Sequence, residues 1–252
     1  MKRLRRFRQT LVGWVYPPVC GACEEPLETS RQVDRPFLCE ECESTLEPVG
    51  EDYCGVCGQR YHAFVSRLSR CANCGDRELG IDFAVSAYRS SGVARGLMHR
   101  FKYEKQRHLS RLMGTLLDEV WRDRRLHRDS WFVVPVPLHP RRMRERGFNQ
   151  SHEIAGELVR RAPANVNLTL CPALKRVRHT VRQAQLDRHD RLRNLSDAFE
   201  IGGRLPKSAK VPAGWLIVDD VVTTGTTVSE CAGVLRGALE VEAVAAVSVL
   251  RG

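Results

Sequence analysis

Eight of the ten cysteines in this chain of 252 residues fall in C-x-x-C pairs. The pairs are Cys20/Cys23, Cys39/Cys42, Cys54/Cys57 and Cys71/Cys74. A C-x-x-C turn places two sulfurs on one side of a tight loop, and two such turns facing each other form the tetrahedral S₄ cage that Zn²⁺ favours. The spacing therefore predicts a double zinc ribbon over residues 20–78 with two zinc sites.

Disulfides and redox C-x-x-C sites are the alternatives for these cysteines. No secretion signal precedes them, which disfavours disulfides, and a redox site would need only one pair. Sequential pairing of the C-x-x-C turns is the simplest arrangement, although the spacing also allows a crossed one. In either case four protein thiolates fill each zinc ion's coordination, so the predicted zinc is structural rather than catalytic.

Two adjacent carboxylates, Asp219 and Asp220, end the buried strand pattern WLIVDD, and a turn rich in Thr and Gly leads from them into a helical pattern. Backbone N–H groups, hydroxyls and the positive end of a helix suit this turn to a phosphate. The turn consists of Thr223, Thr224, Gly225, Thr226 and Thr227. Carboxylates repel phosphate but accept hydrogen bonds from vicinal hydroxyls, so a ribose 5-phosphate satisfies both features. The simpler alternative is that the carboxylates cap the helix, for which one Asp would suffice.

Basic segments provide candidate contacts for a second anionic group. Arg141 and Arg142 follow a strand pattern in PLHPRRMRERGFNQ, and they could bind a pyrophosphate through bidentate contacts. Lys102, near the end of a helical pattern, is a third candidate. The polar stretch 175–194 is too long for an ordinary connection and suggests a lid, with Arg182 and Gln183 as its candidate ligand contacts. Solvated basic faces and a surface loop are the alternative interpretations.

The surrounding pattern predicts an α/β fold. Strand patterns at 81–89, 131–137, 197–201, 215–220 and 241–250 alternate with helical patterns at 92–103, 108–123, 151–162 and 226–239, and a basic turn is expected at 139–150. This alternation favours a mainly parallel sheet with helices on both faces. The expected organisation is a basic leader (1–19), the cysteine module (20–78) and an α/β domain (79–252).

Charge and hydropathy limit the partners and the location. The formal charge is +10, and eight thiolates holding two Zn²⁺ ions would lower it to about +6. Polyanions, either phosphorylated metabolites or nucleic acid, are therefore reasonable partners. No apolar run approaches the roughly 18 residues that a membrane span needs, and the N-terminus lacks a signal-peptide pattern. We expect a cytoplasmic protein without membrane insertion.

The segment LIVDDVVTTGTT resembles the phosphoribosyl-pyrophosphate (PRPP) signature of type I phosphoribosyltransferases. PVPLHPRRMRERGFNQ, the later RHTVRQAQLDRHDRLRN and the paired cysteines in front resemble the ComF family of competence-associated, phosphoribosyltransferase-like proteins. The resemblance implies a type I phosphoribosyltransferase-like sheet behind the double zinc ribbon. It makes Asp219 and Asp220 the ribose-diol pair, 223–227 the 5-phosphate loop, 137–142 the pyrophosphate loop and 175–194 the mobile cover.

The same resemblance implies PRPP, with Mg²⁺, as the ligand and a role in DNA uptake. It makes the chain a candidate phosphoribosyltransferase, an enzyme of pentosyl transfer, although no residue identifies itself as a general base and no segment identifies the acceptor. The competing hypothesis is a non-catalytic accessory protein that binds single-stranded DNA and uses the pocket for a nucleotide 5-phosphate. An aromatic content of 7% is low for a base-stacking surface, which weighs against that alternative.

Overall fold

A computed structural model describes residues 19–27, 37–61, 71–128, 130–178, 197–202, 205 and 214–252. The predicted basic leader lies outside the described residues except for Val19. Arg182 and Gln183, the candidate contacts of the predicted lid, also lie outside them.

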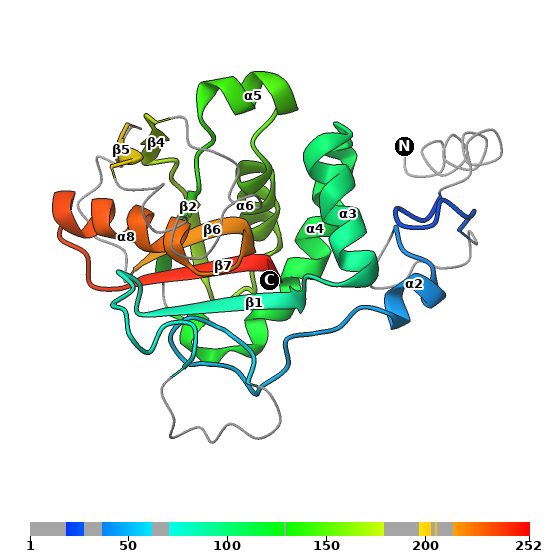
Figure 1. Cartoon of the computed structure of the whole chain (residues 1–252), viewed down its shortest axis with the longest axis horizontal. Helices are drawn as coiled ribbons and strands as arrows, with labels where there is room; N and C mark the ends of the chain where they lie inside the picture. The colour runs from blue at the N-terminus through cyan, green and yellow to red at the C-terminus, as the bar shows by residue number, and fades with distance from the viewer. Residues whose placement is uncertain are drawn as a thin grey trace.

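A parallel sheet has five strands and lies at the centre of the structure (Figure 1). The strands lie in the order β1 (Phe83–Arg89), β7 (Val244–Arg251), β6 (Trp215–Val222), β2 (Ser130–Pro135) and β3 (Asn167–Leu170). A separate antiparallel pair is formed by β4 (Leu174–Arg176) and β5 (Phe199–Ile201). The predicted mainly parallel sheet is confirmed.

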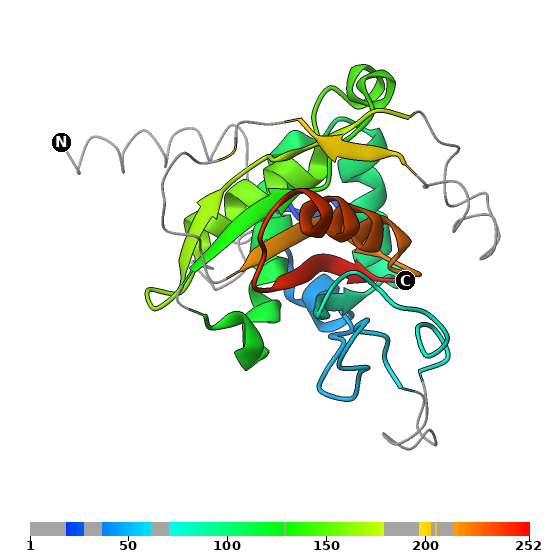
Figure 2. The ribbon, with the colours of Figure 1, turned by 90° about the vertical axis from the view of Figure 1, so that its left-hand side faces the viewer.

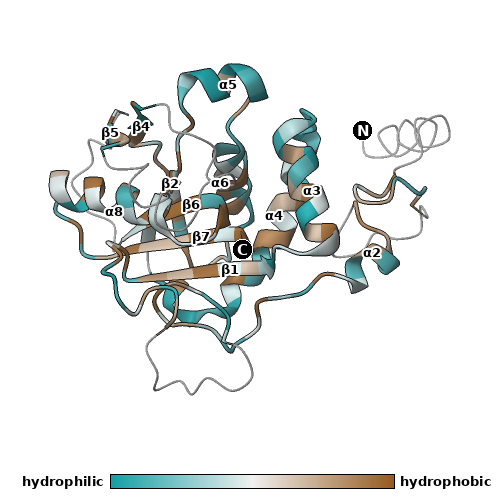
Figure 3. Cartoon of the chain, in the orientation of Figure 1, coloured by the Kyte–Doolittle hydropathy of each residue, from teal (hydrophilic) through white to brown (hydrophobic). Residues whose placement is uncertain are grey.

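Helices cover both faces of the sheet (Figure 2). One face carries α3 (Gly92–Tyr103), α4 (Ser110–Leu117) and α6 (Gln150–Arg161), and the other carries α8 (Thr226–Ala238). The shorter helices are α2 (Glu40–Ser44), α5 (Pro140–Arg146) and the 3₁₀ turns η1 (Arg107–Leu109), η2 (Asp118–Arg122) and η3 (Arg124–Leu126). Successive strand residues point to opposite faces, so Leu216 packs in one core and Ile217 in the other. Most of the sheet is accordingly apolar (Figure 3).

The cysteine module lies along the outer edge of β1. Val49 N donates to the Ala87 carbonyl at 3.0 Å, and Ala84 N of β1 donates to the Val56 carbonyl at 2.7 Å. An uncovered edge strand invites pairing with other chains, and here residues of the module occupy that edge. The zinc-binding segments are therefore attached to the sheet rather than separate from it.

The local structure differs from the sequence expectation in several places, and the strands β3 and β4 were not expected. Residues 139–150 were expected to form a basic turn, and this was wrong, because they contain α5: Pro140 takes its first position, and Gly147 ends it with φ 81°. β6 continues two residues past the carboxylate pair, since its pairing with β7 extends to Val222. The expected helix 108–123 is α4 flanked by 3₁₀ turns. Among the described residues, no helix combines the length and the apolar content that crossing a membrane requires.

Candidate ligand cavity and metal centres

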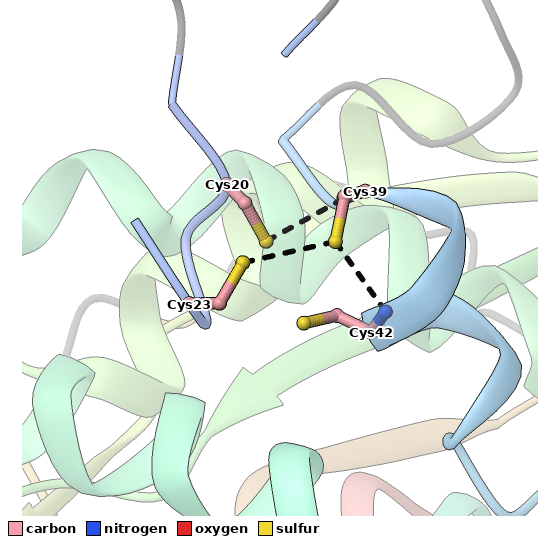
Figure 4. A group of neighbouring side chains, drawn as sticks. All are labelled: Cys20, Cys23, Cys39 and Cys42. Atoms are coloured by element: carbon pink, nitrogen blue, oxygen red, sulfur yellow. Dashed lines mark hydrogen bonds between the residues drawn. The ribbon is translucent and has the colours of Figure 1, made fainter. Parts of the chain in front are cut away.

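The eight paired cysteines form two clusters of four. Within each cluster the four sulfurs lie within 4.8 Å of one another. The first cluster is Cys20, Cys23, Cys39 and Cys42, and the second is Cys54, Cys57, Cys71 and Cys74. A tetrahedral Zn–S₄ unit with bonds of about 2.3 Å has sulfur–sulfur edges of about 3.8 Å. The measured separations of 3.7, 3.7 and 3.6 Å match those edges. Figure 4 shows the first four sulfurs turned toward a shared space.

This arrangement confirms two structural zinc sites and resolves their pairing as sequential. Each cluster supplies four thiolates and leaves no coordination position for a water, which is the mark of a structural site. Both are anchored on the α/β domain. Arg100 of α3 donates to the Gly21 carbonyl at 3.1 Å beside the first cluster. Near the second, the Tyr53 hydroxyl donates to Asp123 Oδ2 at 2.6 Å.

A cavity of about 330 Å³ opens at the carboxyl end of the sheet, where β2 and β6 are neighbours. The helix after β2, α6, lies on one face, and the helix after β6, α8, lies on the other, so this is the switch point at which open α/β sheets bind ligands. The pairing of β2 with β6 ends at Pro135 and Val218. From Asp219 onward the edge of β6 therefore extends beyond β2, and both Asp219 and Asp220 line the cavity.

The two carboxylates have different surroundings. Asp219 Oδ1 accepts hydrogen bonds from the Ser151 hydroxyl at 3.1 Å and from the Asp220 backbone N–H at 2.9 Å. Asp220 Oδ1 lies 2.8 Å from Lys102 Nζ. Burial, followed by the charge of Asp220, raises the pKa of Asp219 to about 7, although Lys102 and Ser151 act against the rise. Asp220 thus has an ammonium partner, while Asp219 is the carboxyl that titrates near neutral pH.

The threonine turn between β6 and α8 divides into two roles. Thr223 and Thr227 line the cavity. Thr224 and Thr226 are buried, and their hydroxyls bond to each other at 2.8 Å, so they shape the turn instead of facing a ligand. Gly225 adopts φ 81° as the N-cap of α8, a left-handed conformation that suits glycine. The first N–H groups of α8 have no acceptor within the helix, and this is the usual setting for a phosphate.

Arginines form the basic wall of the same cavity. Arg142, Arg146 and Arg176 line it, whereas the neighbouring Arg141 pairs with Glu145 at 3.3 Å and has a side chain 64% exposed. Arg176 is only 8% exposed, and burial together with the charge of Arg142 lowers its pKa to about 10. A bound anion would therefore favour the charged form of Arg176, as the nearby Asp219 already does.

Arg176 and Ser151 were not predicted as site residues from the sequence. Arg176 stands near the start of a long basic stretch, and no local signal distinguishes it from the other arginines there. Ser151 begins the predicted helix 151–162, in a position where a serine is ordinary. Lys102 was expected to contact pyrophosphate; it lines the cavity and lies beside Asp220. The ligand roles of the cavity residues stay predictions.

Comparison with known proteins places these features in a family context. The double zinc ribbon domain family matches residues 11–76. Competence protein F of Haemophilus influenzae is 32% identical over 203 residues, which cover 79% of this chain and 84% of that protein. DNA utilization protein YhgH of Escherichia coli is 32% identical over 87% of this chain and 91% of its own length. Competence protein ComFC of Streptococcus pneumoniae is 26% identical over 81% of this chain and 84% of its own length. With this similarity extending over most of the sequence, the chain belongs to the ComF family of competence proteins.

Proposed function

We propose that the cavity binds PRPP or a closely related ribose 5-phosphate ligand. One observation carries the proposal: a single cavity is lined by a carboxylate pair, by the threonine turn at the start of α8 and by buried arginine. These are the three chemistries that a ribose with a 5-phosphate and a 1-diphosphate requires. Carboxylates accept hydrogen bonds from the diol, and the N–H and hydroxyl groups of the turn donate hydrogen bonds to the 5-phosphate. Arginines bind the diphosphate through paired N–H groups.

Each residue then has a defined task in the proposal. Thr223 and Thr227 hold the 5-phosphate, and Arg142 and Arg176 hold the diphosphate. Lys102 orients Asp220 through their ion pair, and therefore contributes to the ribose end of the site. Mg²⁺ takes phosphate oxygens and water as ligands, so it would enter with the diphosphate and offset its charge. The arginines would also stabilise pyrophosphate as it left C1, which suits the site to pentosyl transfer.

The names of the relatives extend the proposal to a biological role. Relatives that cover most of this chain are named for competence and for DNA utilization, and we infer a role in DNA uptake or in the use of incoming DNA. The cytoplasm is the proposed location, because its thiol-reducing conditions keep the eight cysteines available for zinc.

A second candidate function is binding of single-stranded DNA as an accessory protein. The observation that favours it is α5, which buries no residue and holds four arginines in seven positions. Such a helix could follow a phosphate backbone. Replacing Arg141 and Arg144 by Ala should then weaken oligonucleotide binding and reduce its salt slope by up to about 0.7 per lost contact. Unchanged affinity and slope would count against α5 as a DNA site.

Ligand-dependent melting of the zinc-loaded protein tests the main proposal. Mg²⁺-PRPP should stabilise the protein more than ribose 5-phosphate, pyrophosphate or ATP, because only PRPP engages all three parts of the cavity. At a concentration of 100 times Kd the expected gain is about 2.7 kcal/mol. A zinc-replete protein whose melting is equally insensitive to all four ligands would contradict the assignment.

A further inference from the structure

The second zinc centre contacts the backbone of the candidate phosphate turn. Arg77 Nη2 donates to the Thr224 carbonyl at 2.6 Å and to the Asn73 carbonyl at 2.9 Å. The Asn73 side-chain amide also reaches the Thr224 carbonyl at 3.4 Å. Asn73 stands between Cys71 and Cys74, so it belongs to the metal-binding turn itself. The Thr224 carbonyl therefore accepts hydrogen bonds from two residues at or beside the second cysteine cluster.

Arg251, in the last position of β7, donates hydrogen bonds to the two carbonyls that precede the Thr224 carbonyl in the chain. Its Nη1 donates to the Val222 carbonyl at 2.8 Å and to the Thr223 carbonyl. The residue is only 4% exposed. Burial lowers the pKa of Arg251, and the charges of the cysteine sulfurs of the second cluster act in the opposite direction. The guanidinium thus ties the end of β7 to the start of the turn.

Charge explains why a buried arginine is tolerated at this place. A Zn²⁺ ion with four thiolates carries a net charge of −2. A buried cation is costly unless an opposite charge or hydrogen bonds compensate it. The carbonyls of Val222, Thr223 and Gly252 accept hydrogen bonds from Arg251, and the zinc-loaded second centre would add a counter-charge.

Three successive carbonyls before the amides that begin α8 are therefore held by arginine side chains. Arg251 of β7 holds those of Val222 and Thr223, and Arg77, beside the second cysteine cluster, holds that of Thr224. We propose that the second zinc centre, acting through Arg77 and Arg251, holds this turn in the conformation that presents its N–H groups to the ligand. The two arginines are positioning residues in this account. The ligand part of the inference rests on the proposed PRPP site, whereas the ordering of the turn does not depend on the ligand.

The first zinc centre offers a matched control, because Arg100 donates to the Gly21 carbonyl beside that centre and lines no part of the cavity. The test compares Arg77→Met, Arg251→Lys and Arg100→Met in the full-length protein. Hydrogen exchange of amides 223–228, zinc content and Mg²⁺-PRPP affinity are measured for each. Arg77→Met is included because Arg77 is less buried than Arg251, so its loss is easier to tolerate.

Arg77→Met and Arg251→Lys should keep two zinc ions, speed amide exchange in the turn about ten- to hundredfold, and weaken PRPP by a similar factor, as expected when hydrogen bonds from a charged donor are lost. Arg100→Met should change neither the turn nor PRPP affinity. Unchanged exchange in both test variants would overturn the inference, and so would equal loosening in Arg100→Met. If wild-type protein fails to bind PRPP, the proposed function fails, and the exchange rates still decide whether the zinc centre orders the turn.

Discussion

The ammonium of Lys102 lies 2.8 Å from Oδ1 of Asp220, and their side chains are only 18% and 12% exposed. Lys102 comes from α3, the helix after β1, whereas Asp220 belongs to β6, two strands away in the sheet. The contact therefore links α3 to β6 at the cavity. It also separates the roles of the adjacent carboxylates, since Asp220 is paired with a cation and Asp219 is held by neutral donors.

Ligand affinity should rise with pH through neutrality. The pKa of Asp219 is about 7. Only the ionised carboxylate offers both oxygens as hydrogen-bond acceptors to the ribose hydroxyls, because the protonated form is itself a donor. Affinity for Mg²⁺-PRPP should therefore increase between about pH 6 and 8. Lys102→Met removes a charge that lowers this pKa, so it should move the midpoint to higher pH. Titrations across that range, in buffers of constant ionic strength, would contradict the assignment if the two proteins gave the same flat profile.

The unliganded protein should show the opposite trend in stability. An unfolded Asp titrates near pH 3.9, and Asp219 in the folded state titrates near 7. The folded state holds this proton more tightly. The stabilisation that the protonated Asp219 gives to the folded state is therefore fully present below about pH 4 and is lost as the pH rises to 7. Asp219→Asn should therefore lose less unfolding free energy than wild type between about pH 5 and 8.

Urea unfolding at several pH values measures that difference, with Glu145→Gln on the exposed side of α5 as the control. The asparagine retains an oxygen to accept from Ser151, so the comparison isolates the titration. Parallel pH curves for wild type and Asp219→Asn would show that the carboxyl does not carry the expected proton linkage.

Neighbouring arginines on α5 should differ sharply in their importance. Arg142→Met should weaken Mg²⁺-PRPP by about tenfold or more, because it removes charge-assisted hydrogen bonds from the cavity. Arg141→Met should have little effect, because Arg141 is exposed and paired with Glu145. Arg176→Met should resemble Arg142→Met in affinity, as it removes a cation held near Arg142 in the same wall. Equal losses for Arg141→Met and Arg142→Met would place the diphosphate elsewhere.

Much of this architecture was accessible from the sequence, for physical reasons that apply to particular residues. The C-x-x-C spacing fixes the metal chemistry locally, so Cys20 and Cys57 could be assigned to zinc sites without knowledge of the fold. The strand before Asp219 and the glycine-containing turn after it are likewise predicted from a local pattern of about a dozen residues. The sequential pairing was open until the two clusters could be seen.

The features that escaped prediction depend on contacts distant in sequence. Arg176 became a buried cavity residue because β4 pairs with β5 and its guanidinium lies over the Phe199 ring. The docking of the cysteine module on β1, through Val49 and Val56, is invisible in local patterns. α5 had local signals at Pro140 and Gly147, but it lacks the apolar face by which helices are usually recognised.

The two zinc centres should release metal at different rates. In the first cluster Cys23 is exposed and Cys39 is partly exposed, whereas in the second Cys54, Cys57 and Cys74 are buried. A chelator should therefore remove one zinc per chain quickly and the other slowly, because the second centre must open before its thiolates become accessible. A colorimetric zinc assay follows both phases, and Cys23→Ser should abolish the fast one. A single phase of two zinc ions would show that the centres open together.

Binding calorimetry of Mg²⁺-PRPP tests the central claim most directly, using zinc-replete wild type and the double variant Asp219→Asn, Asp220→Asn. Wild type should bind one PRPP per chain. The double variant should retain both zinc ions and bind at least about tenfold more weakly, since two charge-assisted acceptors for the diol are lost. If wild type gives no binding heat at any temperature tested, or if the double variant binds as tightly as wild type, the cavity is not a ribose-diphosphate site.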